Sequence, residues 1–336
     1  MNNPAMRDTF EVANSPPDGI SSLHFSSQAD YLLASSWDNN VRIYEILQSG
    51  QANAKAMYSH EGPVLQAQWS PDGTMIASGG CDKAIKLYDI NTGQSRQMGT
   101  HDQPVSCVRW VETGQGQSIL ATASWDKTLK YWDPRQPNPA MSVNLPERAY
   151  AMDTKKQLLV VGTAERHSCI INLSNPSTIF KTITVPLKFQ TRSVACFNDA
   201  AGFAIGSIEG RAAIQYIDES KSSNNFTFKC QRSGNNIFPV NAISVNPVYG
   251  TMSTAGGDGT YNFWDKDAKI RLKFSDPVGG PITCSSFSRT GNIFAYAISY
   301  DWSKGYTGAD GKIPNKIMLH ACKEEDIKPR NKGTKR

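Results

Sequence analysis

Three stretches of the chain repeat one pattern: SSWDNNVRIYEI from Ser35 to Ile46, GGCDKAIKLYDI from Gly79 to Ile90, and ASWDKTLKYWDP from Ala123 to Pro134. In each stretch an aspartate precedes a short alternation of apolar and polar residues, which is typical of a β-strand. The three aspartates, Asp38, Asp82 and Asp126, are 44 residues apart in each case. The chain is therefore built from repeated units of about 40–45 residues.

Weaker copies of the pattern continue over the rest of the chain. They begin at Leu158, Gly202, Gly250 and Pro281, and the last copy resumes its third strand only near Lys316. A period of this length that ends in an aromatic–Asp pair is the signature of WD40 repeats, each of which forms one four-stranded propeller blade. Seven repeats predict an all-β, seven-bladed propeller. One blade cannot bury both of its faces, so we expect the ring to fold as a single domain.

Closure of the ring is expected to involve the N-terminus, because the seventh repeat supplies only three strands. Residues 8–12 (DTFEV) precede the first blade and have no other partner. We expect them to form the outer strand of the last blade, which removes the free sheet edges. The propeller then spans residues 8–328, between an N-terminal tail of residues 1–7 and a basic C-terminal tail of residues 329–336 that are both expected to be disordered.

Two histidines are expected to stabilise the blades from within. His60 and His101 come just before blades 2 and 3, in SHEGPV and THDQPV. In WD40 repeats such a histidine bonds the turn aspartate and a Ser or Thr of the second strand. We therefore interpret His60 with Asp82, and His101 with Asp126 and Trp132, as structural groups rather than catalytic ones.

Composition and motifs exclude several classes of function. The net charge is +5 and the pI about 8.7, which permits an acidic partner without requiring one. The seven cysteines show no CxxC or zinc-like spacing, and the chain lacks GxxxxGK[ST], GxSxG and HExxH motifs. It also lacks an apolar run near 18 residues and a leader segment. We expect a protein that is not an enzyme, with no metal, cofactor or membrane span.

Two tryptophans stand beside turn aspartates on one rim of the predicted disc. Trp37 and Trp125 lie between the second and third strands of blades 1 and 3. They could pack against neighbouring loops, or they could form an aromatic platform for a partner, which we favour because aromatic anchors dominate interface energies. The long loop from Ser299 to Lys316 brings Trp302 and Lys304 to the same rim and is expected to extend this platform.

A basic run near the end of the sixth repeat suggests a second surface. FWDKDAKIRLK, from Phe263 to Lys273, contains Lys266, Lys269 and Arg271. Such a run is commonly a solvated face. Together with Phe228 of the preceding FTFKC strand, it also fits a basic groove with an aromatic floor, which suits single-stranded nucleic acid.

At these residues the chain resembles the WD40 mRNA export factors of the nuclear pore. The resemblance is carried by SIEGRAAIQYI, FTFKCQRS, FWDKDAKIRLK, GNIFAYAISYDWSKG and IKPRNK, together with the SWD turns of blades 1 and 3. It covers nearly the whole chain. The mitotic checkpoint propeller of the Bub family is a near relative that shares the SWD turns and the EGR sequence.

This resemblance implies a set of partners and contacts. The top face is expected to bind the GLEBS motif of a GLFG-repeat nucleoporin, with Arg211 pairing with a glutamate and with Trp37 and Trp125 against its apolar side. A basic side groove is expected to bind single-stranded RNA or mRNA–protein particles through Phe228, Trp264, Asp265, Lys266, Lys269 and Arg271. Lys269 stands where arginine is expected, so a bidentate phosphate contact is not expected there.

The resemblance also implies a role and a place in the cell. We expect a non-enzymatic adaptor that supports mRNA export, in the nucleus, at the nuclear envelope at the pore, and in the cytoplasm. The alternative is a spindle checkpoint adaptor that binds GLEBS motifs of mitotic kinases or scaffolds on the same face.

Overall fold

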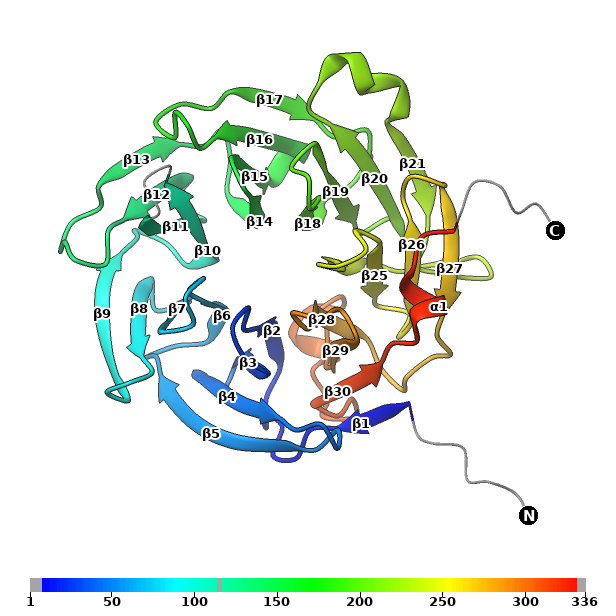
Figure 1. Cartoon of the computed structure of the whole chain (residues 1–336), viewed down its shortest axis with the longest axis horizontal. Coiled ribbons are helices and arrows are strands. Elements are labelled where there is room, and N and C mark those ends of the chain that lie inside the picture. The colour runs from blue at the N-terminus through cyan, green and yellow to red at the C-terminus, as the bar shows by residue number, and fades with distance from the viewer. Residues whose placement is uncertain (1–7, 114–116, 331–336) are drawn as a thin grey trace.

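The computed structural model describes residues 8–113 and 117–330. Within this part of the chain, seven four-stranded antiparallel sheets stand around a central axis (Figure 1). This arrangement confirms the seven-bladed propeller predicted from the repeats. The expectations for the N-terminal tail and for residues 331–336 concern residues outside the described part.

Blades 1 to 4 follow one another along the chain. The strands of blade 1 are β2 (Ile20–Phe25), β3 (Tyr31–Ser36), β4 (Asn40–Ile46) and β5 (Ala52–Ser59). Those of blade 2 are β6 (Val64–Trp69), β7 (Met75–Gly80), β8 (Ala84–Asp89) and β9 (Gln94–Thr100). Those of blade 3 are β10 (Val105–Thr113), β11 (Gln117–Ser124), β12 (Thr128–Trp132) and β13 (Met141–Asn144). Those of blade 4 are β14 (Ala149–Lys155), β15 (Leu158–Thr163), β16 (His167–Asn172) and β17 (Lys181–Thr184).

Blades 5 to 7 complete the ring. The strands of blade 5 are β18 (Thr191–Cys196), β19 (Gly202–Ser207), β20 (Arg211–Tyr216) and β21 (Phe226–Lys229). Those of blade 6 are β24 (Val240–Val245), β25 (Met252–Gly256), β26 (Tyr261–Asp265) and β27 (Ile270–Phe274). Those of blade 7 are β28 (Ile282–Phe287), β29 (Ile293–Ile298), β30 (Lys316–Ala321) and the N-terminal β1 (Thr9–Glu11).

The ring closes through β1, as the sequence predicted. This strand pairs antiparallel with β30, with Thr9 opposite His320 and Glu11 opposite Met318. The backbone N–H of Val12 continues the ladder to the carbonyl of Ile317 at 2.8 Å, and the Val12 side chain is buried. The first and last segments of the propeller are thereby joined in one sheet, and β1 covers the edge that β30 would otherwise expose.

Turn aspartates set the local geometry between the second and third strands. Asp38, Asp82 and Asp126 each accept a hydrogen bond through Oδ1 from the backbone N–H two residues on, at 2.9–3.1 Å. This contact closes an Asx turn. The residue after each aspartate has a positive φ of 66–71°, a conformation that a short turn requires. Gly210 and Gly259 take the equivalent left-handed position in blades 5 and 6, with φ of 62° and 71°.

The hydrophobic core lies between neighbouring blades, in a series of clusters around the ring. Leu33 and Ile43 of blade 1, for example, pack with Val64 and Trp69 of blade 2. The glycine at position 99 leaves room for the Trp132 ring of blade 3, because a Cβ there would lie 2.3 Å from that ring. Each blade therefore buries its faces against its neighbours, which makes the described residues of the ring one cooperative unit.

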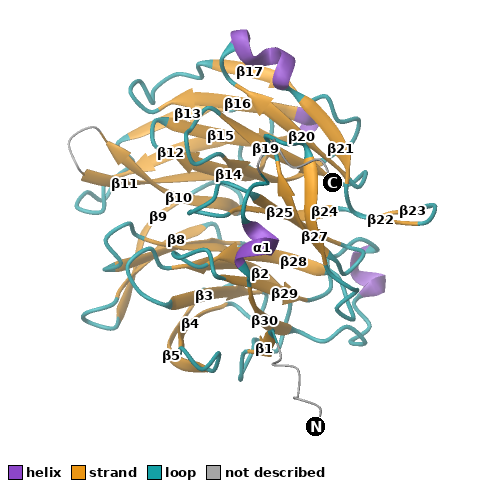
Figure 2. Ribbon diagram, turned by 45° about the vertical axis from the view of Figure 1, so that its right-hand side comes forward, coloured by secondary structure: helices purple, strands orange, loops and turns teal. Residues whose placement is uncertain are grey.

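A few elements lie outside the blades (Figure 2). They are the hairpin strands β22 (Arg232–Ser233) and β23 (Asn236–Ile237), the 3₁₀ turns η1 (Ala164–Arg166), η2 (Glu219–Asn224) and η3 (Gly305–Gly308), and the helix α1 (Glu324–Ile327). Helix α1 follows blade 7 in the chain and contacts blade 6, where Thr251 Oγ1 donates to the carbonyl of Ile327 at 2.6 Å. No helix in the described ranges is long and apolar enough to cross a membrane.

Candidate functional site

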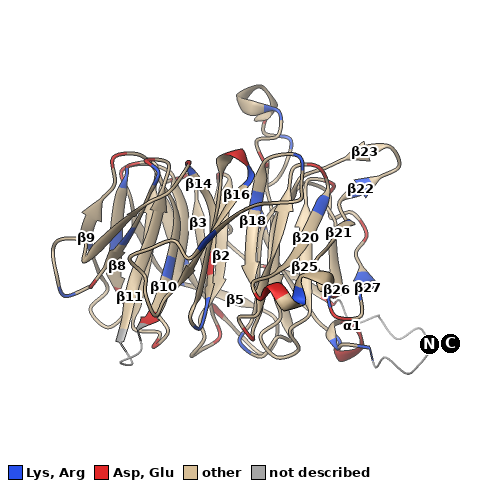
Figure 3. Cartoon of the chain, turned by 90° about the horizontal axis from the view of Figure 1, so that it is seen from above, with Lys and Arg blue, Asp and Glu red and all other residues tan. Residues whose placement is uncertain are grey.

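The loops of the propeller lie on its two faces, as the edge-on view in Figure 3 shows. We call the top face the one that carries the turns between second and third strands and the connections from one blade to the next. The hairpin of β22 and β23 belongs to such a connection, between blades 5 and 6. The candidate partner-binding residues fall into three places: the centre of the top face, its rim at blade 5, and the side of the disc between blades 5 and 6.

A β-bulge in every inner strand shapes the centre of the top face. The pairing of the first two strands shifts register by one residue at the same place in all seven blades. A bulge leaves one residue out of the ladder and changes the direction of its side chain. The bulged residues line the upper end of the central channel: Ser21, Leu65, Ser106, Tyr150, Arg192, Asn241 and Thr283.

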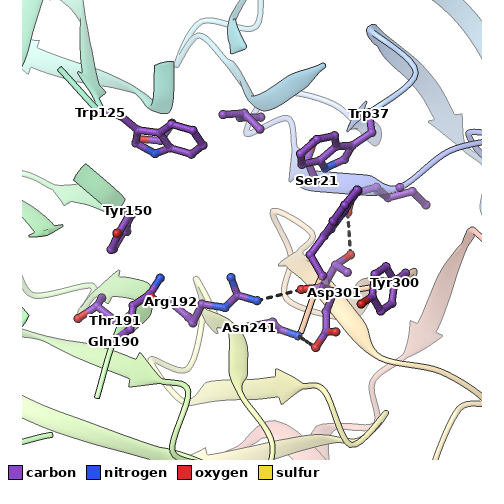
Figure 4. A pocket seen from close by; sticks show the side chains of 16 residues that line it. Ser21, Trp37, Trp125, Tyr150, Gln190, Thr191, Arg192, Asn241, Tyr300 and Asp301 are labelled. Atoms are coloured by element: carbon purple, nitrogen blue, oxygen red, sulfur yellow. Dashed lines mark hydrogen bonds between the residues drawn. The ribbon is translucent and has the colours of Figure 1, made fainter. Parts of the chain in front are cut away.

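This ring forms the wall of a pocket of about 450 Å³, which we call the central pocket. Trp37, Trp125 and Trp302 also line it, with Trp37 and Trp125 on opposite sides (Figure 4). The ring centroids of Trp37 and Trp302 are 4.9 Å apart and stacked. Trp125 is 37% exposed and Trp302 41%. The structure thus brings together the three tryptophans that the sequence placed on the platform, around an open cavity.

The long loop of blade 7 reaches this pocket at its beginning. Trp302 has a φ of 59°, a strained conformation for an aromatic residue. The backbone N–H of Lys304 donates to Tyr300 Oη at 3.0 Å, and this hydroxyl donates in turn to the carbonyl of Gly305 at 2.9 Å. Lys304 is exposed and does not line the pocket. Its position on the top rim is nevertheless set by these contacts with Tyr300.

Arg211 lies away from the central pocket, on the rim of blade 5. It is the first residue of β20, directly after the turn, and pairs in register with Lys229 of β21. Neither side chain has an ion-pair or hydrogen-bond partner within the described part of the chain. Two like charges placed directly opposite each other in a sheet repel. The pair is therefore a site where an anion from outside the chain would be stabilised.

Exposed apolar side chains lie on turns near this pair, and we call the whole area the blade 5 rim. Phe189 is 55% exposed, Ile208 40% and Ile237 51%. The backbone N–H of Ile208 donates to the carbonyl of Gln190 at 3.0 Å, and a Cβ on Gly210 would lie 3.2 Å from Ile237. The three apolar side chains therefore stand on adjoining turns. Cations beside exposed apolar groups suit an acidic, amphipathic segment.

The side groove lies where β21 of blade 5 meets blade 6. The rings of Phe228 and Trp264 are 4.7 Å apart, and those of Phe226 and Phe228 are 5.8 Å apart. Lys269 Nζ lies 4.8 Å from the Phe226 ring centroid, within the range of a cation–π contact. The structure thus brings Phe228, Trp264 and Lys269 together, and it adds Phe226, which was not among the predicted residues.

The other predicted groove residues are engaged in contacts within the chain. Asp265 is 4% exposed, and its carboxylate accepts from the backbone N–H groups of Asp267, Ala268 and Arg330 at 2.9–3.2 Å. Lys266 Nζ donates to both carboxylate oxygens of Asp267, at 2.8 and 2.9 Å. The exposed Arg271 lies over Phe274, 5.1 Å from its ring centroid. Lys269 and Arg271 are therefore the cations with N–H groups available to a phosphate backbone.

The contact of Arg330 with Asp265 also bears on the C-terminal tail. Pro329 and Arg330 belong to the basic tail by sequence, yet both are among the described residues. The backbone N–H of Arg330 donates to Asp265 Oδ2 at 3.2 Å, so the described chain ends in contact with the third strand of blade 6.

The histidines expected to be structural lie within hydrogen-bond distance of their expected partners. His60 Nδ1 is 2.9 Å from Asp82 Oδ2, and its Nε2 is 2.7 Å from Ser78 Oγ. His101 Nδ1 is 2.8 Å from Asp126 Oδ2, and its Nε2 is 2.8 Å from Thr122 Oγ1. Trp132 Nε1 donates to the same Thr122 oxygen at 2.8 Å. Blade 3 thus contains a continuous chain of contacts from turn to tryptophan.

Blade 6 builds the same chain with glutamine in place of histidine. Gln231 is fully buried, and its Nε2 donates to Asp258 Oδ1 at 2.9 Å. Its Oε1 accepts from Thr254 Oγ1 at 3.0 Å, and Thr254 accepts from Trp264 Nε1 at 2.9 Å. Gln231 was not predicted from the sequence, because the residue expected at this place in a WD40 blade is histidine. The available signal was the order of the elements: Gln231 lies between the outer strand of blade 5 and the inner strand of blade 6, as His101 lies between β9 and β10, although Gln231 is nine residues before β24 and His101 only four before β10.

Arg192 was missed as well, although it lines the central pocket. Its position could have been found by counting within the repeats. Ser21, Leu65 and Asn241 stand 17 residues before the turn aspartates of blades 1, 2 and 6. Arg192 stands 17 residues before Glu209. It is the only charged residue in the ring of bulges.

The described residues contain no group of three or more His, Cys, Asp or Glu side chains placed to hold a metal ion. All seven cysteines are free. Burial raises the pKa of the Cys107 thiol to about 11 and that of the Cys284 thiol to about 12. These two thiols therefore stay protonated at neutral pH, a form in which they are poor nucleophiles.

Comparisons with known proteins agree with this architecture. A family model for the WD domain, G-beta repeat, matches residues 9–45, 53–89 and 93–133. The chain is 58% identical over 331 residues to the Poly(A)+ RNA export protein of Schizosaccharomyces pombe, covering 97% of this chain and 94% of that protein. It is 49% identical over 340 residues to the mRNA export factor GLE2 of Chaetomium thermophilum, covering 98% and 95%. It is 45% identical over 333 residues to protein Rae1 of Drosophila melanogaster, covering 96% of each.

Proposed function

Because this chain belongs to the Rae1/Gle2 family of mRNA export factors, we propose that it is an adaptor that holds an acidic nucleoporin segment on its top face during mRNA export. The segment is of the GLEBS type, from a GLFG-repeat nucleoporin. The adaptor acts in the nucleus, at the nuclear pore, and on the cytoplasmic side where the particle leaves. Membership of a family of export factors, rather than of enzymes, agrees with the non-enzymatic role expected from the sequence.

The observation that carries this proposal is the unpaired cation pair on the blade 5 rim. Arg211 and Lys229 face each other across two strands, and an incoming glutamate or aspartate relieves their repulsion. The exposed Phe189, Ile208 and Ile237 supply the apolar contact that an amphipathic segment needs. The stacked Trp37 and Trp302 offer a second apolar contact toward the centre. An acidic segment that crosses the top face would meet both surfaces.

The test is calorimetric titration of the full-length protein with a synthetic GLEBS-type peptide. Arg211→Glu is expected to lose about 2–5 kcal/mol of binding free energy, because it replaces attraction by repulsion. Trp37→Ala and Trp125→Ala are each expected to lose about 2 kcal/mol. Lys156→Glu is the matched control. This exposed lysine lies in the turn between β14 and β15 on the opposite face, so its reversal should leave the affinity unchanged.

A wild-type protein that does not bind the peptide would overturn the proposal. Wild-type affinity in all three top-face variants would show that the peptide binds another surface. The checkpoint alternative uses the same face, so this titration does not separate the two roles. The names of the relatives favour export, since two of them refer to RNA or mRNA export.

A second surface supports contact with single-stranded RNA. The side groove presents Phe228 and Trp264 in contact, with the exposed Lys269 and Arg271 beside them. Base stacking on aromatic side chains and cations along the phosphate backbone are the two components of sequence-tolerant single-strand binding. We therefore propose weak, salt-sensitive binding of single-stranded RNA here, separate from the peptide site on the top face.

A further inference from the structure

The central pocket contains a single cation in its ring of bulged residues. Six of the seven bulged side chains are uncharged, and Arg192 of blade 5 is the exception. Arg192 is half-buried and points toward the middle of the pocket (Figure 4). Its one hydrogen bond within the described residues runs from Nη2 to the main-chain carbonyl of Asp301 at 3.0 Å. A guanidinium has five N–H donors, so most of its hydrogen-bonding capacity is unused.

The nearby carboxylate of Asp301 does not form an ion pair with this cation. Its Oδ2 accepts from Asn241 Nδ2 at 3.2 Å, and its Oδ1 accepts from the backbone N–H of Ser303 at 3.2 Å. Burial lowers the pKa of Arg192, and the attraction of Asp301 offsets this only in part. An arginine nevertheless stays protonated at neutral pH. The pocket therefore holds a partly desolvated positive charge without a directly bonded anion, which is an unfavourable state until a ligand supplies one.

The walls of the pocket are suited to an aliphatic stem. Trp37 and Trp302 stack on one side, and Trp125 and Tyr150 stand on the other (Figure 4). Trp302 keeps its left-handed backbone at the mouth of the pocket. Strain of this kind gathers at ligand-binding positions, because the surrounding structure must hold it in place. This observation is independent of the charge of Arg192 and points to the same cavity.

We propose that the central pocket receives the carboxylate of one glutamate or aspartate side chain from the acidic segment that binds the top face, with Arg192 as its donor. The inference rests on the proposed function and adds a second anchor to it. The blade 5 rim holds one acidic position of the segment through Arg211, and the central pocket holds another. The aromatic walls pack against the stem of that side chain, and the guanidinium fork donates two N–H groups to its carboxylate.

The test is titration of the full-length protein with the same GLEBS-type peptide and with peptides in which each acidic residue is replaced in turn by its amide. Arg192→Gln is expected to weaken binding of the unmodified peptide about tenfold to hundredfold, the range for hydrogen bonds to a charged group. One of the amide peptides lacks the carboxylate that enters the pocket. For that peptide, Arg192→Gln should change the affinity little. Arg192→Lys keeps the charge but loses the fork, so its loss should be smaller.

Controls separate this effect from misfolding. Arg289→Gln removes an arginine on the other face, where Arg289 pairs with Asp30, and should leave the affinity unchanged. Thermal unfolding of each variant shows whether the ring is intact, and Arg192→Lys supplies the comparison if Arg192→Gln does not fold.

The outcomes distinguish the two proposals. Wild-type protein that does not bind the peptide overturns the proposed function and this inference with it. Binding that is equal in wild type and Arg192→Gln overturns this inference and leaves the proposed function standing. Binding of free glutamate that depends on Arg192, with no effect of Arg192→Gln on the peptide, would assign the pocket to a small carboxylate and overturn the peptide assignment.

Discussion

Blade 3 and blade 6 each carry a tryptophan at or next to the end of the third strand, yet Trp132 and Trp264 stand in different surroundings. Each indole N–H donates to a threonine of the second strand, at 2.8 Å in blade 3 and 2.9 Å in blade 6. Trp132 is only 2% exposed, whereas Trp264 is half-buried and contacts Phe228 of the neighbouring blade. A tryptophan with the same hydrogen bond is thus buried in blade 3 and forms part of the surface in blade 6.

The difference shows how a repeat acquires a binding surface without losing its structure. In blade 6 the chain of hydrogen bonds is intact, with Gln231 where blade 3 has His101. The changes that matter lie outside that chain, in Phe228 and in the basic turn after Trp264. A blade can therefore keep the contacts that hold the ring together and still vary the residues around them.

The largest expected effect is on the stability of the protein, and it should differ between the two tryptophans. Trp132→Ala should lower the free energy of unfolding by about 3–5 kcal/mol, because it empties a fully packed site. Trp264→Ala should cost about 1–3 kcal/mol, since part of its ring remains in solvent. Denaturant unfolding of both variants measures the two values. Equal losses of unfolding free energy would show that the partial exposure of Trp264 does not reduce its contribution to stability. They would contradict the difference proposed between the two blades.

The next effect concerns binding at the side groove. Phe228→Ala should weaken binding of a short single-stranded RNA by about 1–3 kcal/mol, the range for loss of one stacked base. Trp110→Phe is a suitable control, because Trp110 is buried in blade 3. Fluorescence anisotropy with the full-length protein gives the affinities. If Phe228→Ala binds RNA like the wild type, the aromatic pair of blade 6 serves packing alone.

A smaller effect is expected from the two exposed cations beside Trp264. In the double variant Lys269→Gln and Arg271→Gln, the dependence of log affinity on log salt should flatten by about 1.4, or about 0.7 for each phosphate that is no longer neutralised. Lys266→Gln should change the slope less, since Lys266 is paired with Asp267. The same anisotropy series at several salt concentrations measures the slopes. An unaltered slope in the double variant would mean that these cations do not meet phosphates.

The smallest effect tests the exchange of histidine for glutamine. Burial lowers the pKa of His101, and the nearby Lys130 adds to this, although Asp126 and Asp102 oppose it. Below the ordinary histidine pKa of about 6.5, the unfolded chain then binds a proton that the folded chain does not. The stability of the wild type should therefore fall as the pH drops from 7 toward 5. The variant His101→Gln has in blade 3 the residue that blade 6 has at this place. Its stability should fall less than that of the wild type between pH 7 and pH 5, as thermal unfolding at each pH would show.

The fold was predictable because its determinants are local and repeated. The spacing of Asp38, Asp82 and Asp126 is set by the number of residues that one four-stranded blade needs, and the missing fourth strand of blade 7 required a partner from residues 8–12. Such features depend on chain geometry. They are therefore visible in a single sequence.

The candidate site was predictable only where it repeated that local pattern. Trp37 and Trp125 flank turn aspartates, so their rim position followed from the turns. The place of Arg192 in its repeat can be counted from the sequence, but the bulge in β18 that brings its side chain to the pocket depends on pairing between strands rather than on residue type. The burial of Asp265 and the pairing of Lys266 likewise depend on neighbours in space, and a run of charges in the sequence does not reveal them.

Closure by β1 gives the protein an unusual order of assembly during synthesis. Thr9 and His320, which meet in the finished sheet, are 311 residues apart in the chain. At a typical ribosomal rate of about 5–20 residues per second, β1 waits about 15–60 s for its partner. Over that interval the nascent chain exposes an unpaired strand at its start and growing sheet edges at its end. We expect the pairing of β1 with β30 to be the last step of folding, and we expect the nascent chain to be a client of chaperones that shield free strand edges.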